Sequence, residues 1–242
     1  MKKYQPLIFL FLFVPFISHA QLGKKLGGLL GGENSEAKGG GLSEKEIISG
    51  LKEALAQGIK KGATQASSPD GFLKNEVIKL LLPPELQRAE STLRKMGLGP
   101  EVDKFIVSLN RAAEGAAKES VPIFANAVTS MSITDALSIL NGADTAATSY
   151  LKQKTNTQLY KAFSPVVKNT LDKNHVSRYY TDLANAYNKV PLVKKINPDL
   201  IQYATQKTMD GLFHLVGEEE KKIRKDPVAR VTQTLKKVFG QG

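Results

Sequence analysis

Residues 100–117 read PEVDKFIVSLNRAAEGAA and place apolar side chains at the spacing of an α-helix. Proline suits the first helical position, because its missing N–H would have no intrahelical partner there. The side chains expected on the inward face are Val102, Phe105, Ile106, Leu109, Ala113 and Ala116. Apolar residues separated by three and four positions are typical of an amphipathic helix that packs on a core. We expect this helix to kink or break at Pro122.

The same helical period continues on both sides of this stretch. Ser43 and Glu46 have the spacing of a capping box at the start of a helix. A short helix is expected between the turn at Pro69-Asp70-Gly71 and Leu80. Further helix starts are predicted at Pro84, Thr134, Asp144, Ser177, Pro198-Asp199 and Asp226-Pro227. In the first helix, Gly50, Gly58 and Gly62 indicate either close approach of another helix or fraying.

These elements define the predicted fold class. The helix that follows Asp144 is expected to continue to Leu171 with a bend at Pro165, and no segment alternates convincingly with a period of two. The sequence therefore predicts an all-α fold, a single bundle-like domain of about eight to ten helices over residues 42–242.

Residues 1–20 have the features of a secretory signal peptide. Lys2 and Lys3 precede an apolar run from Leu7 to Phe13, and Ser18-His19-Ala20 resembles a cleavage site before Gln21. A membrane anchor is the alternative, but the run is shorter than a span needs and Pro15 interrupts it. We expect export to the periplasm or the extracellular space, with no transmembrane segment left after cleavage.

Residues 21–41 are predicted to be a flexible linker, because eight glycines between positions 22 and 41 make ordering of the backbone costly. Leu22, Leu26, Leu29 and Leu30 have helical spacing, with Lys24 and Lys25 between them. A short amphipathic helix on a membrane surface is the alternative interpretation.

Composition excludes several kinds of chemistry. The chain has no cysteine, so disulfides and thiolate sites are excluded. It has three histidines, of which His175 and His214 lie far apart in the sequence, so a histidine-based zinc site would need ligands from distant segments. No nucleotide-binding or hydrolase motif is present, and we expect no cofactor. The net charge of +11 favours anionic lipid, a wall polymer or simple solubility over nucleic acid, which an exported protein rarely meets.

Two sets of polar residues are candidate sites. On the helix that begins at Pro100, Asp103, Asn110 and Glu114 are expected on one face, with Arg111 paired to Glu114. Such a set either binds a polar ligand or locks the packing of helices. The second set is Thr134, Asp135, Asp144, Thr145 and Thr148. Its oxygens suit a hard cation, but the spacing matches no EF-hand loop and Asp144 is explained as a helix cap, so no metal site is predicted.

A charged motif covers residues 218–230. Its residues of interest are Glu219, Glu220, Arg224, Asp226 and Arg230. Glu218–Lys222, Glu220–Arg224 and Asp226–Arg230 are spaced four apart with the acid first, which is typical of a solvated helix end stabilised by ion pairs. The tyrosines at 150, 160, 179, 180, 187 and 203 suit a core or the wall of an apolar groove.

Several short sequence motifs, which occur in the same order, resemble those of the Domain of Unknown Function 4197 family of exported bacterial proteins. They are DGF (70–72), LPPEL (82–86), LRKMG (93–97), NRAAE (110–114), MSITDALSILNG (131–142), DTAATSYL (144–151), DGLF (210–213) and EEEKKIRKDPVAR (218–230). The resemblance spans roughly Ser43 to Gly240. It implies export and one helical domain, and it implies no activity.

The leading hypothesis is therefore a non-enzymatic exported protein that binds a lipid or other amphiphile, or an envelope component, between its helices. An enzyme that uses Asp103, Asn110, Arg111, Glu114, Asp135 and Asp144 is the alternative, and it requires these residues to face one pocket. A structural or assembly module is the third hypothesis.

Overall fold

The computed structural model describes residues 43–189, 192, 195, 197, 199–226 and 236. The predicted signal peptide, the predicted linker and the predicted helix after Asp226 lie outside the described residues, apart from position 236. All described residues belong to one compact unit, residues 42–242. The predicted all-α fold is confirmed, since the described part contains helices and turns and no strand. The predicted number of eight to ten helices stays a prediction.

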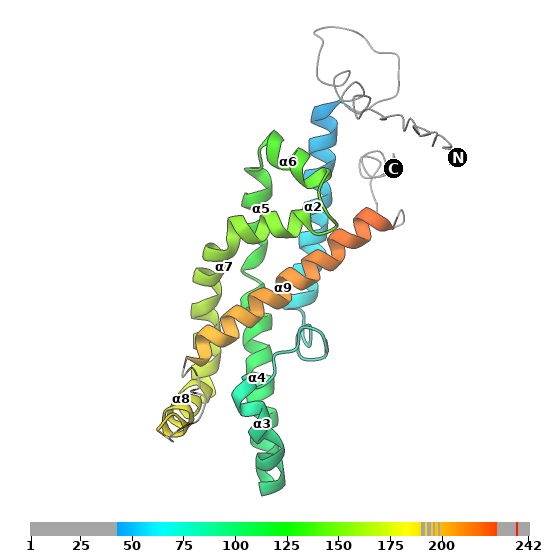
Figure 1. Cartoon of the computed structure of the whole chain (residues 1–242). Coiled ribbons are helices and arrows are strands. Elements are labelled where there is room, and N and C mark those ends of the chain that lie inside the picture. Colours follow the sequence, from blue (N-terminus) through cyan, green and yellow to red (C-terminus); the bar gives the residue numbers. More distant parts are fainter. Residues whose placement is uncertain are drawn as a thin grey trace, which may run out of the picture. The chain divides into compact units, whose positions relative to one another are not determined.

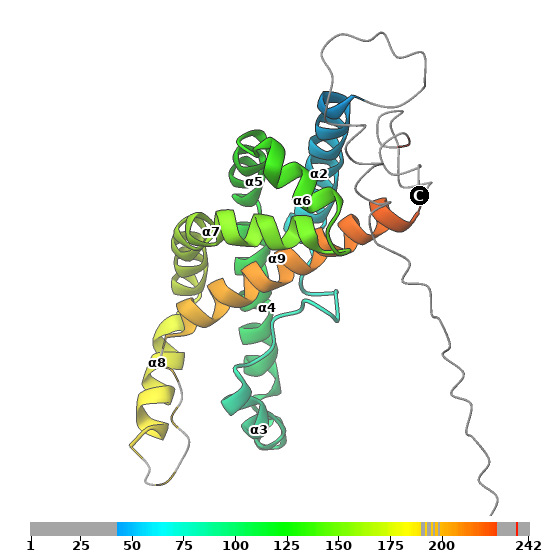
Figure 2. The same ribbon diagram turned by 45° about the horizontal axis from the view of Figure 1, so that its top comes forward.

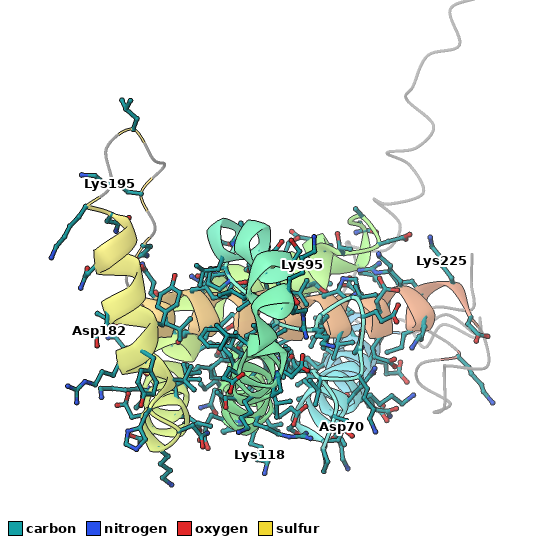
Figure 3. All side chains as sticks on the ribbon, turned by 90° about the horizontal axis from the view of Figure 1, so that it is seen from below. Asp70, Lys95, Lys118, Asp182, Lys195 and Lys225 are labelled. Carbon is teal, nitrogen blue, oxygen red and sulfur yellow. The ribbon has the colours of Figure 1, made fainter. Side chains whose placement is uncertain are left out.

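Three long helices lie side by side and a fourth crosses them (Figures 1 and 3). The first three are α2 (Glu44–Ser67), α4 (Gly99–Ala117) and α7 (Ala146–Lys173), with α4 in the middle. The crossing helix is α9 (Leu200–Lys225), which contacts all three. The core of the unit lies between α9 and this layer, where Leu109, Leu151 and Leu212 are fully buried.

Shorter helices occupy the two ends of this arrangement (Figure 2). At one end α5 (Ser120–Thr129) and α6 (Ile133–Leu140) pack on α2 and α7. At the other end lie α3 (Pro84–Leu93), the π-helical turn η1 (Arg94–Leu98) and α8 (Val176–Tyr187). Gly97 in η1 has φ of +84°, a backbone conformation that suits glycine, and it separates α3 from α4.

Close packing of α2 on α9 explains one of the helical glycines. A Cβ atom on Gly62 would lie 3.1 Å from the backbone nitrogen of Val216, so a larger residue would push α9 away. Close approach, one of the two interpretations of these glycines, is thus correct at Gly62.

Several helix boundaries differ from those expected. Residues 69–78 form turns in place of the expected short helix. Ser132 caps α6 in a capping box with Asp135, so Thr134 is not the cap. The first helical residue of α7 is Ala146, and Asp144 does not cap it. α8 begins at Val176, one residue before the predicted cap Ser177.

Pro122 and Pro165 were both expected to disturb a helix. The helix is interrupted near Pro122, as expected, because α4 ends at Ala117 and α5 begins at Ser120. Pro122 lies in the first turn of α5, where backbone N–H groups have no intrahelical partner in any case. α7 continues as one helix through Pro165, as expected, and the bend at this residue stays a prediction.

No described helix is by itself long and apolar enough to cross a membrane, although Gly99–Thr129 and Ile133–Leu140, bent by 105°, meet the length and composition criteria as a pair.

Candidate functional site

Asn110 fixes the irregular segment between α2 and α3, residues 68–83, which we call the anchored loop. The fully buried Asn110 side chain accepts a hydrogen bond from the Leu80 N–H at 2.8 Å and donates to the Leu80 carbonyl at 2.8 Å. Its amide also donates to the Ile106 carbonyl at 2.8 Å. One side chain thus pairs both backbone polar groups of a buried loop residue, which would otherwise be costly to bury.

Glu114 holds the other end of the anchored loop. Its buried Oε1 accepts from the N–H groups of Phe72 and Leu73, at 3.2 and 3.3 Å. Arg111 donates to Glu114 Oε2 at 2.6 Å and to Asp70 Oδ1 at 2.6 Å, so its guanidinium bridges α4 and the loop. The expected Arg111–Glu114 pair is therefore present, and it belongs to a packing network.

Asp70 has φ of +64°, an unusual backbone conformation for a non-glycine residue. Hydrogen bonds from Lys74 and then from Arg111 lower the pKa of its carboxyl, because both cations favour the ionised form.

Asp103 does not join Asn110 and Glu114. It lies near the start of α4 with a side chain 62% exposed, and it binds Arg94 at 2.7 Å. The Arg94 hydrogen bond lowers the pKa of Asp103, with a smaller contribution from the charge of Lys79. Of the three residues expected to act together on one face of α4, only Asn110 and Glu114 bind the anchored loop.

A second buried carboxylate caps α7 from the far end of the chain. Glu220 on α9 accepts from the Ala147 N–H at 2.9 Å, the Thr148 N–H at 2.8 Å and the Thr148 hydroxyl at 2.7 Å. Arg224 pairs with Glu220 at 3.1 Å and donates to the Ile139 carbonyl at 2.8 Å. A carboxylate at a helix N-terminus is favourable because it pairs free N–H groups and meets the positive end of the helix dipole.

The interpretation of residues 218–230 as a solvated helix end is wrong for Glu219 and Glu220, which are both buried. The expected Glu220–Arg224 pair is confirmed. Lys222 pairs with Glu219 at 2.5 Å, while Glu218 pairs with Lys221.

The remaining charged residues of this region occupy separate places. Asp144 binds Lys225 at 2.5 Å, and Asp135 is occupied by the α6 capping box. Asp226 is the C-cap of α9, and Arg230 lies outside the described residues.

The candidate polar residues thus fall into separate sets and form no single site. Arg111 is bound to two carboxylates at the edge of a groove, while Glu220 and Thr148 line a cavity of about 20 Å³, which has room for about one water molecule. The one pocket that the carboxylate enzyme hypothesis requires is not formed by these residues. Among the described residues, no three His, Asp or Glu side chains lie close enough to hold a metal ion.

An apolar groove lies between α4 and α8 and continues beneath α3. The α4–α8 groove has a volume of about 920 Å³, with a connected hollow of about 190 Å³ that shares Glu101, Phe105 and Tyr179 with it. The apolar residues that line the groove are Pro100, Phe105, Val107, Val176 and Tyr179. Those that line the connected hollow are Leu82, Leu86, Leu93, Leu98, Val102, Phe105, Tyr179 and Tyr180. Tyr179 is 71% exposed, so a large aromatic surface faces solvent.

A more polar hollow lies between the anchored loop and α9. This loop–α9 pocket has a volume of about 310 Å³. Its polar lining residues are Lys79, Gln87, Tyr203, Lys207, Asp210 and His214. Sequence reasoning missed this pocket, because its residues come from segments more than a hundred positions apart.

The family model described as a protein of unknown function, DUF4197, matches residues 41–240. The chain belongs to this family. The resemblance seen in the sequence is therefore confirmed, and the DUF4197 match includes both buried carboxylate networks and both hollows. The chain matches no curated protein and no solved structure.

Proposed function

We propose that the chain is an exported, non-enzymatic protein that binds an anionic amphiphile in the α4–α8 groove. The observation that carries this proposal is the apolar lining of an open groove of about 920 Å³, with Tyr179 71% exposed at its edge. A hollow of this size is typical of sites for small ligands, and burial of its apolar surface favours an acyl chain.

Acidic and basic side chains both line the groove, and among the basic ones Lys104 supports an anionic head group. Lys104 lines the groove and is exposed, and no ion pair of Lys104 is found among the described residues. Asp103 is already bound to Arg94, and Arg111 to two carboxylates. Lys104 is therefore the cation best placed to meet a ligand carboxylate or phosphate.

Export is part of the proposal and rests on the sequence. The lysines at positions 2 and 3, the apolar run that follows and the small residues before Gln21 support a cleaved signal peptide. An exported protein meets lipids and other amphiphiles of the cell envelope.

The groove is tested by calorimetric titration with sodium laurate below its micelle-forming concentration. Val107→Asp and Tyr179→Asp place a charge on apolar groove surface, so each is expected to weaken binding at least about tenfold. Ile133→Asp is the matched control, because Ile133 is 55% exposed, lies outside the groove and occupies the first turn of α6, where an acid is tolerated. Equal affinity in wild type and the two groove variants would refute the proposal.

The head-group contact has its own test. Lys104→Glu is expected to weaken laurate binding about tenfold while leaving the neutral dodecyl maltoside unaffected. Lys118→Glu is the control, since Lys118 is exposed just beyond α4 and points outward (Figure 3). Equal losses in both variants would indicate only a general effect of net charge.

A further inference from the structure

The loop–α9 pocket is a second hollow, and hydrogen bonds and close packing hold its loop wall in place. Asn110 pairs both backbone groups of Leu80, so the neighbouring residues Lys79 and Leu81 are held at the pocket wall. On the other side, a Cβ on Gly211 would lie 2.7 Å from Phe72 Cε1, so the loop packs directly against α9. Binding groups on a loop held by a rigid scaffold need little further ordering.

Two lysines and a histidine line this pocket. Lys79 comes from the loop, while Lys207 and His214 come from α9. Within the described part of the chain, neither lysine has a carboxylate at ion-pair distance, and Asp210 is the only acidic side chain that lines the pocket. One lysine from the loop and one from α9 line the same pocket, which favours a ligand group with two negative charges, as in a phosphate monoester.

Hydrogen-bond acceptors line the rest of the pocket. Tyr203 donates its hydroxyl proton to the Leu81 carbonyl at 3.1 Å, and Gln87 uses its amide N–H on the Leu82 carbonyl at 2.8 Å. Asp210 Oδ1 accepts from Gln206 at 3.1 Å. The Gln87 carbonyl and Asp210 Oδ2 can then accept hydrogen bonds from a ligand, which suits hydroxyl groups.

We infer that the loop–α9 pocket binds a small phosphorylated polyol. Its phosphate lies between Lys79, Lys207 and His214, and its hydroxyls donate to Gln87 and Asp210. The inference is independent of the amphiphile groove, which is lined by none of these five residues.

The test uses the full chain and three soluble probes: sn-glycerol 3-phosphate, inorganic phosphate and glycerol. Glycerol phosphate is expected to bind saturably and to shift the ring signals of His214 in NMR spectra, which His214→Gln assigns. Phosphate alone is expected to bind more weakly, and glycerol not at all. Lys79→Gln and Lys207→Gln should each reduce the affinity for glycerol phosphate about tenfold. Lys161→Gln, an exposed lysine on α7, is the matched control.

Vesicles containing phosphatidic acid distinguish a free ligand from a lipid head group. Binding of these vesicles with loss in Lys207→Gln, but no binding of free glycerol phosphate, assigns the pocket to a lipid phosphate. No saturable binding of either form overturns the inference, as does an equal loss of affinity in Lys161→Gln and Lys207→Gln. A failure here leaves laurate binding by the groove unchanged, so the two proposals can fail separately.

Discussion

At the residue scale, the buried polar side chains serve mainly as partners for backbone groups. Asn110 and Glu114 satisfy N–H and carbonyl groups of the anchored loop, and Glu220 accepts from two N–H groups at the start of α7. The sequence predicted that Arg111 and Glu114 pair, because their spacing is local. It could not predict Leu80 or Ala147 as partners, since those contacts depend on the packing of distant segments.

Replacement of Asn110 tests this role. Asn110→Ala leaves the N–H and carbonyl of Leu80 unpaired in the core, so we expect the free energy of unfolding to fall by about 2–4 kcal/mol. Asn126→Ala, at an exposed position of α5, is expected to change it by less than about 0.5 kcal/mol. Urea denaturation of both variants measures the difference, and similar midpoints would contradict the role assigned to Asn110.

Ionisation of Asp70 is expected to make the stability of the fold depend on pH. Its pKa is lowered in the folded chain by Lys74 and Arg111, so its contribution to stability is present above the unfolded pKa of about 3.9. That contribution is lost as the pH falls through the folded pKa. We expect the urea midpoint of wild type to fall below about pH 4 more steeply than that of Asp70→Asn. Parallel pH profiles would show that the Asp70 ion pairs do not stabilise the fold.

At the element scale, the anchored loop is as much a packing element as the helices beside it. Its Phe72 is fully buried and contacts α9 where Gly211 leaves room. The turn signal at residues 69–71 was visible in the sequence, and the short helix expected after it was wrong. Helical spacing over so few residues could not outweigh the side-chain hydrogen bonds that α4 supplies to an irregular backbone.

Two glycine substitutions separate packing from helix propensity. Gly211→Ala must displace Phe72 or Ile78, so we expect it to cost about 1–3 kcal/mol of unfolding free energy. Gly115→Ala is the matched control, because its Cβ would lie 3.6 Å from Val166 Cγ1, an ordinary contact. Alanine favours a helix by up to about 1 kcal/mol over glycine, so this control should be neutral or stabilising. Equal destabilisation of both would contradict close packing at Gly211.

At the scale of the whole molecule, the sequence was sufficient for the fold class, because helical periodicity is a local signal. The two hollows could not be predicted, since each is built from helices or loops that meet only in the folded chain. Tyr179 was a partial exception: the spacing of the tyrosines was compatible with a groove wall, but it did not indicate which of them face solvent.

The proposed export makes a prediction for the intact chain. Protein recovered from the cell envelope is expected to have the mass of a chain that begins at Gln21. Leu10→Arg interrupts the apolar run and is expected to leave the precursor uncleaved inside the cell. Recovery of the full-length mass from the envelope fraction would instead favour the anchor interpretation of residues 1–20.

The Glu220–Arg224 network also sets an order of events for a growing chain. The amides at the start of α7 find their carboxylate more than seventy residues later in the sequence. A polypeptide that emerges one end at a time cannot finish this region until its last described helix has been made. Chains cut short before residue 220 therefore lack the carboxylate that pairs with the amides of Ala147 and Thr148.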